Sequence, residues 1–152
     1  MNTNTAVDSG ENLKANALIE PVRVIARYVN GKVLKGYTHD FSPNKQIFRI
    51  YPSIDEHSQE GTKIHMLDLK ALFFVRDFVG NPSYNEEKHF SKDRQFLGRK
   101  IEVTFKDGEV LVGTTMGYTP QRLGFFLFPA DPKSNNLRVF VISAAVRKMR
   151  IL

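Results

Sequence analysis

The sequence has 152 residues, of which 41% are hydrophobic and 25% are charged, and its formal net charge is +6. This balance is typical of a folded globular chain and excludes a disordered or membrane-embedded one. The chain contains no cysteine, which excludes disulfide frameworks, thiolate metal sites and cysteine nucleophiles, and we expect a cytoplasmic protein.

Residues 1–20 are rich in polar side chains and lack the basic start and apolar run of a signal peptide. We expect them to form a flexible N-terminal tail. The longest apolar clusters, 71–75 and 124–129, are far shorter than the roughly 20 residues that a transmembrane helix needs, so no membrane span is expected.

Residues 21–78 are predicted to form a first small β-module. Apolar residues alternate over 24–28, which is typical of a half-buried strand, and Asn30-Gly31 favours a tight hairpin turn after it. Gly36 lies inside the second strand, where a glycine indicates a bulge or sharp bend. The three remaining strands are expected at 46–51, 63–67 and 72–76.

Residues 79–98 are predicted to be a polar linker, which starts with a Gly-Asn-Pro sequence at 80–82. Phe90, Phe96 and Leu97 are spaced so that they could form the apolar side of one short helix.

Residues 99–152 repeat the first module at an offset of 77 residues. Gly31 aligns with Gly108 and Gly36 with Gly113, and the alignment continues without a gap to Pro52 and Pro129. A repeat at fixed offset indicates a tandem duplication. The later strands of this copy are expected at 124–128, 137–142 and 148–152. The loops 52–62 and 129–136 differ in length and composition, so they are candidates for divergent function.

The run 103–113, followed by Tyr118 and Leu127, resembles the first signature of Sm-like RNA-binding barrels. Segments 69–78 and 124–136 also resemble a poorly characterised bacterial family, which occurs alone or attached to larger regulatory proteins and supplies no reaction. These resemblances imply an all-β fold, in which a five-stranded, strongly bent Sm-like or SH3-like small barrel is duplicated in tandem. They also make nucleic acid one alternative ligand.

A second resemblance is to PilZ domains, which are barrels that bind cyclic di-GMP through two arginines and an Asp-x-Ser segment. The matching residues here are Arg23, Arg27, Asp40 and Ser42. This resemblance implies an alternative nucleotide-binding site at those four positions.

No catalytic or metal-binding pattern is found in the sequence. The four histidines, His39, His57, His65 and His89, lie in separate predicted elements without paired-ligand spacing. No serine lies in a nucleophile-elbow pattern, and the glycines are not grouped into a phosphate-binding loop. We therefore predict a protein that is not an enzyme and needs neither a metal nor a cofactor.

The candidate binding residues are polar or basic and lie mainly where the two copies differ. Residues 99–152 carry nine basic and four acidic side chains, against nine and six in 22–78, so the second copy has the larger positive charge. Amide and guanidinium donors of this kind suit a polar or anionic partner. The candidates are Arg122, Asn135, Asn136, Arg138, Arg147, Lys148 and Arg150.

Exposed strand edges of small β-modules can accept a strand from another protein. We therefore predict a non-enzymatic binding or regulatory module whose partner is another protein, with nucleic acid and cyclic di-GMP as the alternatives.

Overall fold

The computed structural model describes residues 21–55, 60–92 and 95–152. These residues form ten β-strands and two short 3-10 helices and contain no α-helix, which confirms the predicted all-β class. The predicted tail, 1–20, and His57 lie outside the described residues.

The two halves of the chain contain the same elements in the same order. The first half comprises β1 (Val22–Tyr28), β2 (Val33–Thr38), β3 (Ile47–Ile50), β4 (Thr62–His65), η1 (Met66–Asp68) and β5 (Leu69–Val75). The second half comprises β6 (Arg99–Phe105), β7 (Val110–Thr115), β8 (Gly124–Pro129), β9 (Asn136–Ile142), η2 (Ser143–Ala145) and β10 (Val146–Ile151).

The repeat keeps its 77-residue offset along its whole length. Arg99 begins β6 and Val22 begins β1, 77 residues apart, and Ser143 of η2 follows Met66 of η1 by the same interval. The loop before β9 is shorter than the loop before β4 only because β9 starts earlier. Strand β9 begins at Asn136, whereas the residue that corresponds to Thr62, the first residue of β4, is Val139. Strand pairing, not an insertion, therefore distinguishes the two loops.

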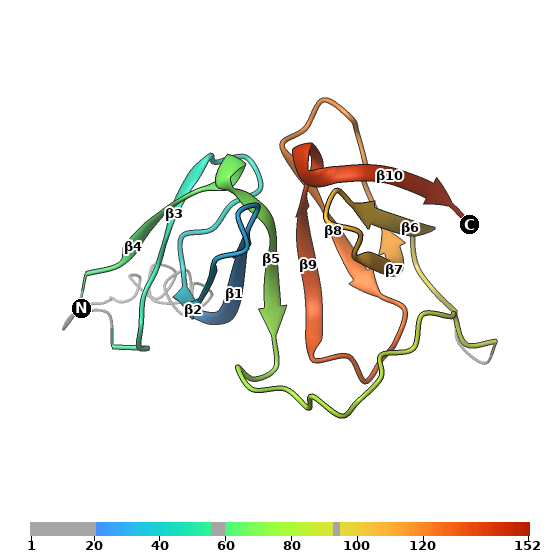
Figure 1. Ribbon diagram of the computed structural model, residues 1–152, viewed down its shortest axis with the longest axis horizontal. Coiled ribbons are helices and arrows are strands. Elements are labelled where there is room, and N and C mark those ends of the chain that lie inside the picture. Colours follow the sequence, from blue (N-terminus) through green and yellow to red (C-terminus); the bar gives the residue numbers. More distant parts are fainter. Residues whose placement is uncertain (1–20, 56–59, 93–94) are drawn as a thin grey trace, which may run out of the picture.

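Eight strands form one antiparallel sheet in the order β10-β6-β7-β8-β9-β5-β1-β2 (Figure 1). Strands β3 and β4 form a separate two-stranded sheet, which is joined to β2 by backbone hydrogen bonds of 2.8 Å between Tyr37 and Tyr51. The large sheet is not closed into a barrel, in contrast to the two barrels that the sequence indicates. The reason is that β5 of the first half pairs with β9 of the second, which merges the halves into one sheet.

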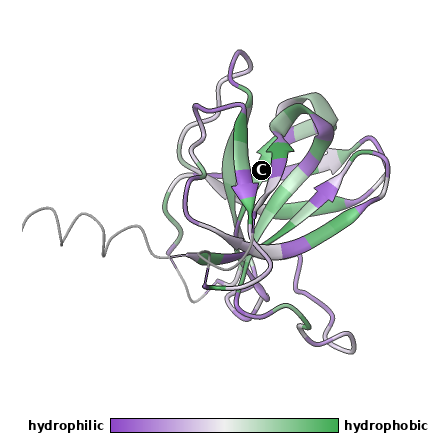
Figure 2. Cartoon of the chain, turned by 90° about the vertical axis from the view of Figure 1, so that its left-hand side faces the viewer, coloured by the Kyte–Doolittle hydropathy of each residue, from purple (hydrophilic) through white to green (hydrophobic). Residues whose placement is uncertain are grey.

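Strand β5 lies at the joint and contributes to two hydrophobic cores. Ala71, Phe73 and Val75 pack into the core of the second half, whereas Leu72 and Phe74 pack into that of the first. All seven residues of β5 are buried. A strand that is buried on both faces is expected to be continuously apolar, as 71–75 is. Figure 2 shows the apolar residues along the strands and mainly hydrophilic residues in the loops.

The linker forms no helix over 79–92 and 95–98, so the predicted linker helix is wrong. Its backbone N–H groups bond to side chains instead, for example that of Glu87 to the Asp131 carboxylate at 2.7 Å. Phe90 and Phe96 pack edge to face with ring centroids 4.7 Å apart, and the Lys100 Nζ atom lies 4.9 Å from the Phe90 centroid. The linker aromatics therefore cover the start of β6.

Glycines in the second strand of each half allow a close approach of the backbone. A Cβ atom on Gly113 would lie 2.1 Å from the Phe128 carbonyl oxygen, and one on Gly36 would lie 2.5 Å from that of Tyr51. Gly113 is also the residue at which β7 begins to pair with β8. These glycines therefore permit the close approach at which each second strand, still paired with the first strand, also begins to pair with the third.

Candidate functional site

The 131–136 loop, predicted from sequence as a candidate recognition loop, holds the linker. Asp131 is buried, and its carboxylate accepts hydrogen bonds from the Tyr84 hydroxyl, from the Glu87 N–H at 2.7 Å and from the Lys133 N–H at 2.8 Å. The Asp131 bond raises the pKa of Tyr84 to about 12. Burial acts to raise the pKa of Asp131, but these hydrogen bonds outweigh it and lower that pKa.

Asn135 and Asn136 make contacts within the same loop and with the end of β5. The Asn135 side chain donates to the Asp77 carbonyl at 2.9 Å and accepts from the Asp77 N–H at 3.2 Å. The Asn136 N–H donates to the Ser134 hydroxyl at 3.0 Å. The Asn135 amide thus fastens the chain after β5 through both its nitrogen and its oxygen.

The remaining candidates of this group do not join that loop. Arg122 precedes β8 and Asn135 follows it, so a six-residue strand of roughly 20 Å separates them. The Arg138 guanidinium lies 4.4 Å from the ring centroids of both Phe74 and Phe126, and burial lowers its pKa. The two arginines therefore lie in different surroundings, and Arg122 is separated from the asparagines by the length of β8.

The four PilZ-like positions are also dispersed. Arg27 pairs with Val33 at one end of the β1–β2 ladder. Arg23 and the loop after β2, which carries Asp40 and Ser42, lie at the other end. Asp40 accepts bonds from the Thr38 hydroxyl and the Arg49 N–H, which hold the loop in place. The structure does not bring the four together.

Strand β10 carries the remaining candidates, Arg147, Lys148 and Arg150, all exposed. The Arg150 guanidinium binds the Glu102 carboxylate on β6 at 3.0 Å. Neither Arg147 nor Lys148 has a carboxylate partner among the described residues. Strand β10 ends the eight-stranded order, and no described strand pairs with its outer edge (Figure 1).

Strand β10 corresponds in detail to β5. The pairs Ala26–Leu72 and Ile25–Phe73 in one half match Val103–Met149 and Glu102–Arg150 in the other, each shifted by 77 residues. Both pairings also contain a register shift at the same place, where Lys70 in β5 and Arg147 in β10 are the extra, bulged residues.

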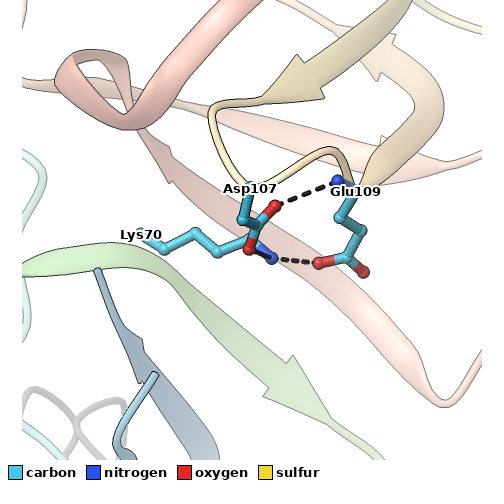
Figure 3. Close-up of polar contacts among 3 residues, drawn as sticks. All are labelled: Lys70, Asp107 and Glu109. Atoms are coloured by element: carbon cyan, nitrogen blue, oxygen red, sulfur yellow. Dashed lines mark hydrogen bonds and ion pairs between the residues drawn. The ribbon is translucent and has the colours of Figure 1, made fainter. Parts of the chain in front are cut away.

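Lys70 on the β5 bulge is held by the second half of the chain (Figure 3). Its Nζ atom lies 2.7 Å from the Asp107 carboxylate, bonds to Glu109 and lies 4.8 Å from the centroid of the Phe105 ring. The Lys70 ammonium lowers the pKa of Asp107. Asp107 and Glu109 belong to the hairpin turn between β6 and β7, so this ion pair joins the two halves.

Sequence reasoning missed this cluster. The available signal is one lysine at position 70 within an otherwise apolar strand, together with two carboxylates on either side of Gly108. A lysine in a buried strand needs a charged partner. The sequence did not show which strands are neighbours, and so it did not show which carboxylates lie near Lys70.

Histidine, aspartate and glutamate side chains are spread over the described ranges 21–55, 60–92 and 95–152. Those ranges hold no group of three His, Asp or Glu side chains that could bind a metal ion. Within them there is also no helix that is long and apolar enough to cross a membrane.

The structure thus defines an all-β protein whose two repeated halves share one sheet, with a basic strand at the edge of that sheet. The chain belongs to a family described as "Family of unknown function (DUF6982)", whose model matches residues 20–152. No curated protein and no solved structure matches it.

Proposed function

We propose that this protein is a non-enzymatic binding module, and that it recognises another protein by accepting a strand at the outer edge of β10. The observation that carries the proposal is the contrast between two equivalent strands. The outer edge of β5 is filled by β9, whereas no described strand occupies the outer edge of β10. Edge strands with unpaired backbone groups are templates for strand addition.

Backbone geometry identifies the donors that such a partner would use. The Leu152 N–H donates to the Lys100 carbonyl of β6 at 2.9 Å. Successive N–H groups of a strand point in opposite directions, so those of Met149 and Ile151 point away from β6. The equivalent residues of β5 point toward β9, in agreement with the 2.9 Å bond from the Arg76 N–H to the Asn135 carbonyl.

The side chains of β10 also suit a surface that is kept for a partner. Ile151 is 53% exposed, and the basic residues Arg147 and Lys148, which lie earlier in the strand, are exposed as well. Charge on an edge strand protects it against unspecific pairing while the backbone stays accessible. A partner strand would cover Ile151 and satisfy the outward N–H groups together.

The substitution Ile151→Pro tests the proposal. Proline removes the outward N–H of Ile151 but leaves the inward bonds to β6, and proline is tolerated at a solvent-facing edge position. Ile151→Ala is the matched control, because it shortens the side chain and keeps the N–H. We expect proteins captured from the native host by the wild type to be retained by Ile151→Ala and lost with Ile151→Pro, as measured by quantitative mass spectrometry.

Equal capture by all three chains, with unchanged folding by circular dichroism, would contradict strand addition. Nucleic acid is the competing ligand, since Arg147 and Lys148 are free to contact phosphates. Binding to mixed RNA that weakens steeply with salt and is unaffected by Ile151→Pro would replace the protein partner by RNA.

A further inference from the structure

The contacts that the second half of the chain makes with β5 indicate which contacts a partner would make with β10, the equivalent strand. We infer that the partner is a different β-protein that presents a carboxylate pair to Arg147, as Asp107 and Glu109 are presented to Lys70. This inference rests on the proposed strand addition at β10 and adds the chemistry of the partner. It also excludes a second copy of this chain that docks in the equivalent way, through its β4 edge and its β1–β2 turn.

The first step is that β5 and β10 offer the same surface geometry. Their pairings with β1 and β6 agree residue by residue at the 77-residue offset, including the bulge at Lys70 and Arg147. A bulge redirects a side chain, so two bulges in the same register present their cations in equivalent places. What binds one strand therefore indicates what fits the other.

The second step is that the cover of β5 has two parts. Strand β9 pairs along its edge, with Leu72 opposite Phe140. The β6–β7 turn then brings Asp107 and Glu109 to the Lys70 Nζ atom, whose side chain is only 11% exposed. A lysine buried this far is stable only with such charged partners. A complete cover thus needs an apolar strand and an acidic hairpin turn.

The third step is that a second copy of this chain has neither the apolar strand nor the acidic hairpin turn at the equivalent positions. If a second copy bound β10 as the second half binds β5, the β1–β2 turn of that copy would face Arg147. This turn carries Asn30 and Lys32 at the positions of Asp107 and Glu109. Lys63 on β4 occupies the position of Phe140. Such a contact would bring Lys32 near Arg147 and force Lys63 into a core position. Like charges across an interface reject the wrong partner.

The experiment introduces the predicted features of the partner into the first half of this chain, so that one copy can bind β10 of another. The triple variant Asn30→Asp/Lys32→Glu/Lys63→Val gives the first half the acidic turn and an apolar edge strand. We expect the wild type to remain monomeric in sedimentation velocity, and the triple variant to shift to dimers and larger head-to-tail species at the same concentration. Lys63→Val alone controls for unspecific adhesion and should stay monomeric.

Two additional substitutions in the triple variant identify the contact. Arg147→Glu should weaken its self-association by at least about tenfold, because it replaces attraction by repulsion. Ile151→Pro should abolish the association by blocking the edge. Circular dichroism of each variant confirms that it remains folded.

The outcomes separate this inference from the proposed function. Self-association of the wild type, a folded triple variant that stays monomeric, or self-association that survives Arg147→Glu would each overturn the acidic-partner inference. If Ile151→Pro nevertheless removes the proteins captured from the host, strand addition at β10 stands without that chemistry.

Discussion

Lys70 and its two carboxylates form an ion-pair cluster that joins the two halves, in addition to the pairing of β5 with β9. The ammonium lies in a buried strand, whereas Asp107 and Glu109 remain partly exposed to solvent. Removing the lysine would leave two carboxylates that water can solvate. Removing both carboxylates would leave a buried cation without a partner, which is the more costly change.

The double variant Asp107→Asn/Glu109→Gln tests this asymmetry. We expect it to lower the free energy of unfolding near neutral pH by roughly 1–3 kcal/mol, because Lys70 keeps amide oxygens as acceptors but loses both counter-charges. Urea unfolding measures this change. Glu60→Gln, which alters an exposed carboxylate, is the control and should have little effect.

The acid dependence of stability has a definite sign. The pKa of Asp107 is lowered in the folded state. The contribution of Asp107 to folding stability is therefore present above its unfolded-state pKa of about 4, and it is lost as the pH falls through its folded-state pKa. The wild type should therefore lose more stability than the double variant between neutral and acid pH. Parallel loss in both proteins would show that the Lys70 contact does not supply this stability.

Asp131 and Tyr84 make a second residue-level prediction. Because the Asp131 bond is the main cause of the raised Tyr84 pKa of about 12, Asp131→Asn should return the pKa toward about 10. The contribution of Tyr84 to stability is present below pH 10 and disappears as the pH rises toward 12. Ultraviolet titration of the tyrosinate measures the shift, and an unaltered titration in the variant would contradict the assignment.

The individual elements were largely predictable from sequence, but their pairing was not. Alternation at 24–28 and the glycines at 31 and 108 are local signals, and strands and turns occur there. The linker helix was wrong because Asp131, which is distant in sequence, takes up the Glu87 N–H. Closed barrels were expected because a single copy gives no sign that β5 pairs with β9.

The glycine at the bend of β7 makes a prediction at the scale of the element. Gly113→Ala should lower the free energy of unfolding by more than about 2 kcal/mol, since its Cβ would lie 2.1 Å from a backbone oxygen of β8. Gly117→Ala is a suitable control, because its Cβ would meet nothing within 4 Å. Thermal unfolding compares them. Equal stability of both variants would show that the bend tolerates a side chain.

At the scale of the whole molecule, the duplication produces one asymmetric sheet. The strand β5 packs into both cores, so Ala71, Phe73 and Val75 of the first half are part of the hydrophobic core of the second half. The repeat could be predicted from sequence, as could the idea that function lies where the copies differ. The location of that difference depends on strand neighbours. The loop candidates Asn135 and Asn136 are used within the fold, in bonds to Asp77 and Ser134, whereas β10 remains at the edge of the sheet.

The open edge of β10 is the central claim, and amide hydrogen exchange of the free protein, resolved by residue with NMR, tests it most directly. We expect the amides of Leu72 and Phe74, which face β9, to exchange at least about a hundredfold more slowly than those of Met149 and Ile151. The inward Leu152 amide serves as the internal reference for an intact β6–β10 pairing. Protection of Met149 and Ile151 equal to that of Leu72 and Phe74 would contradict an edge that is free to receive a partner strand.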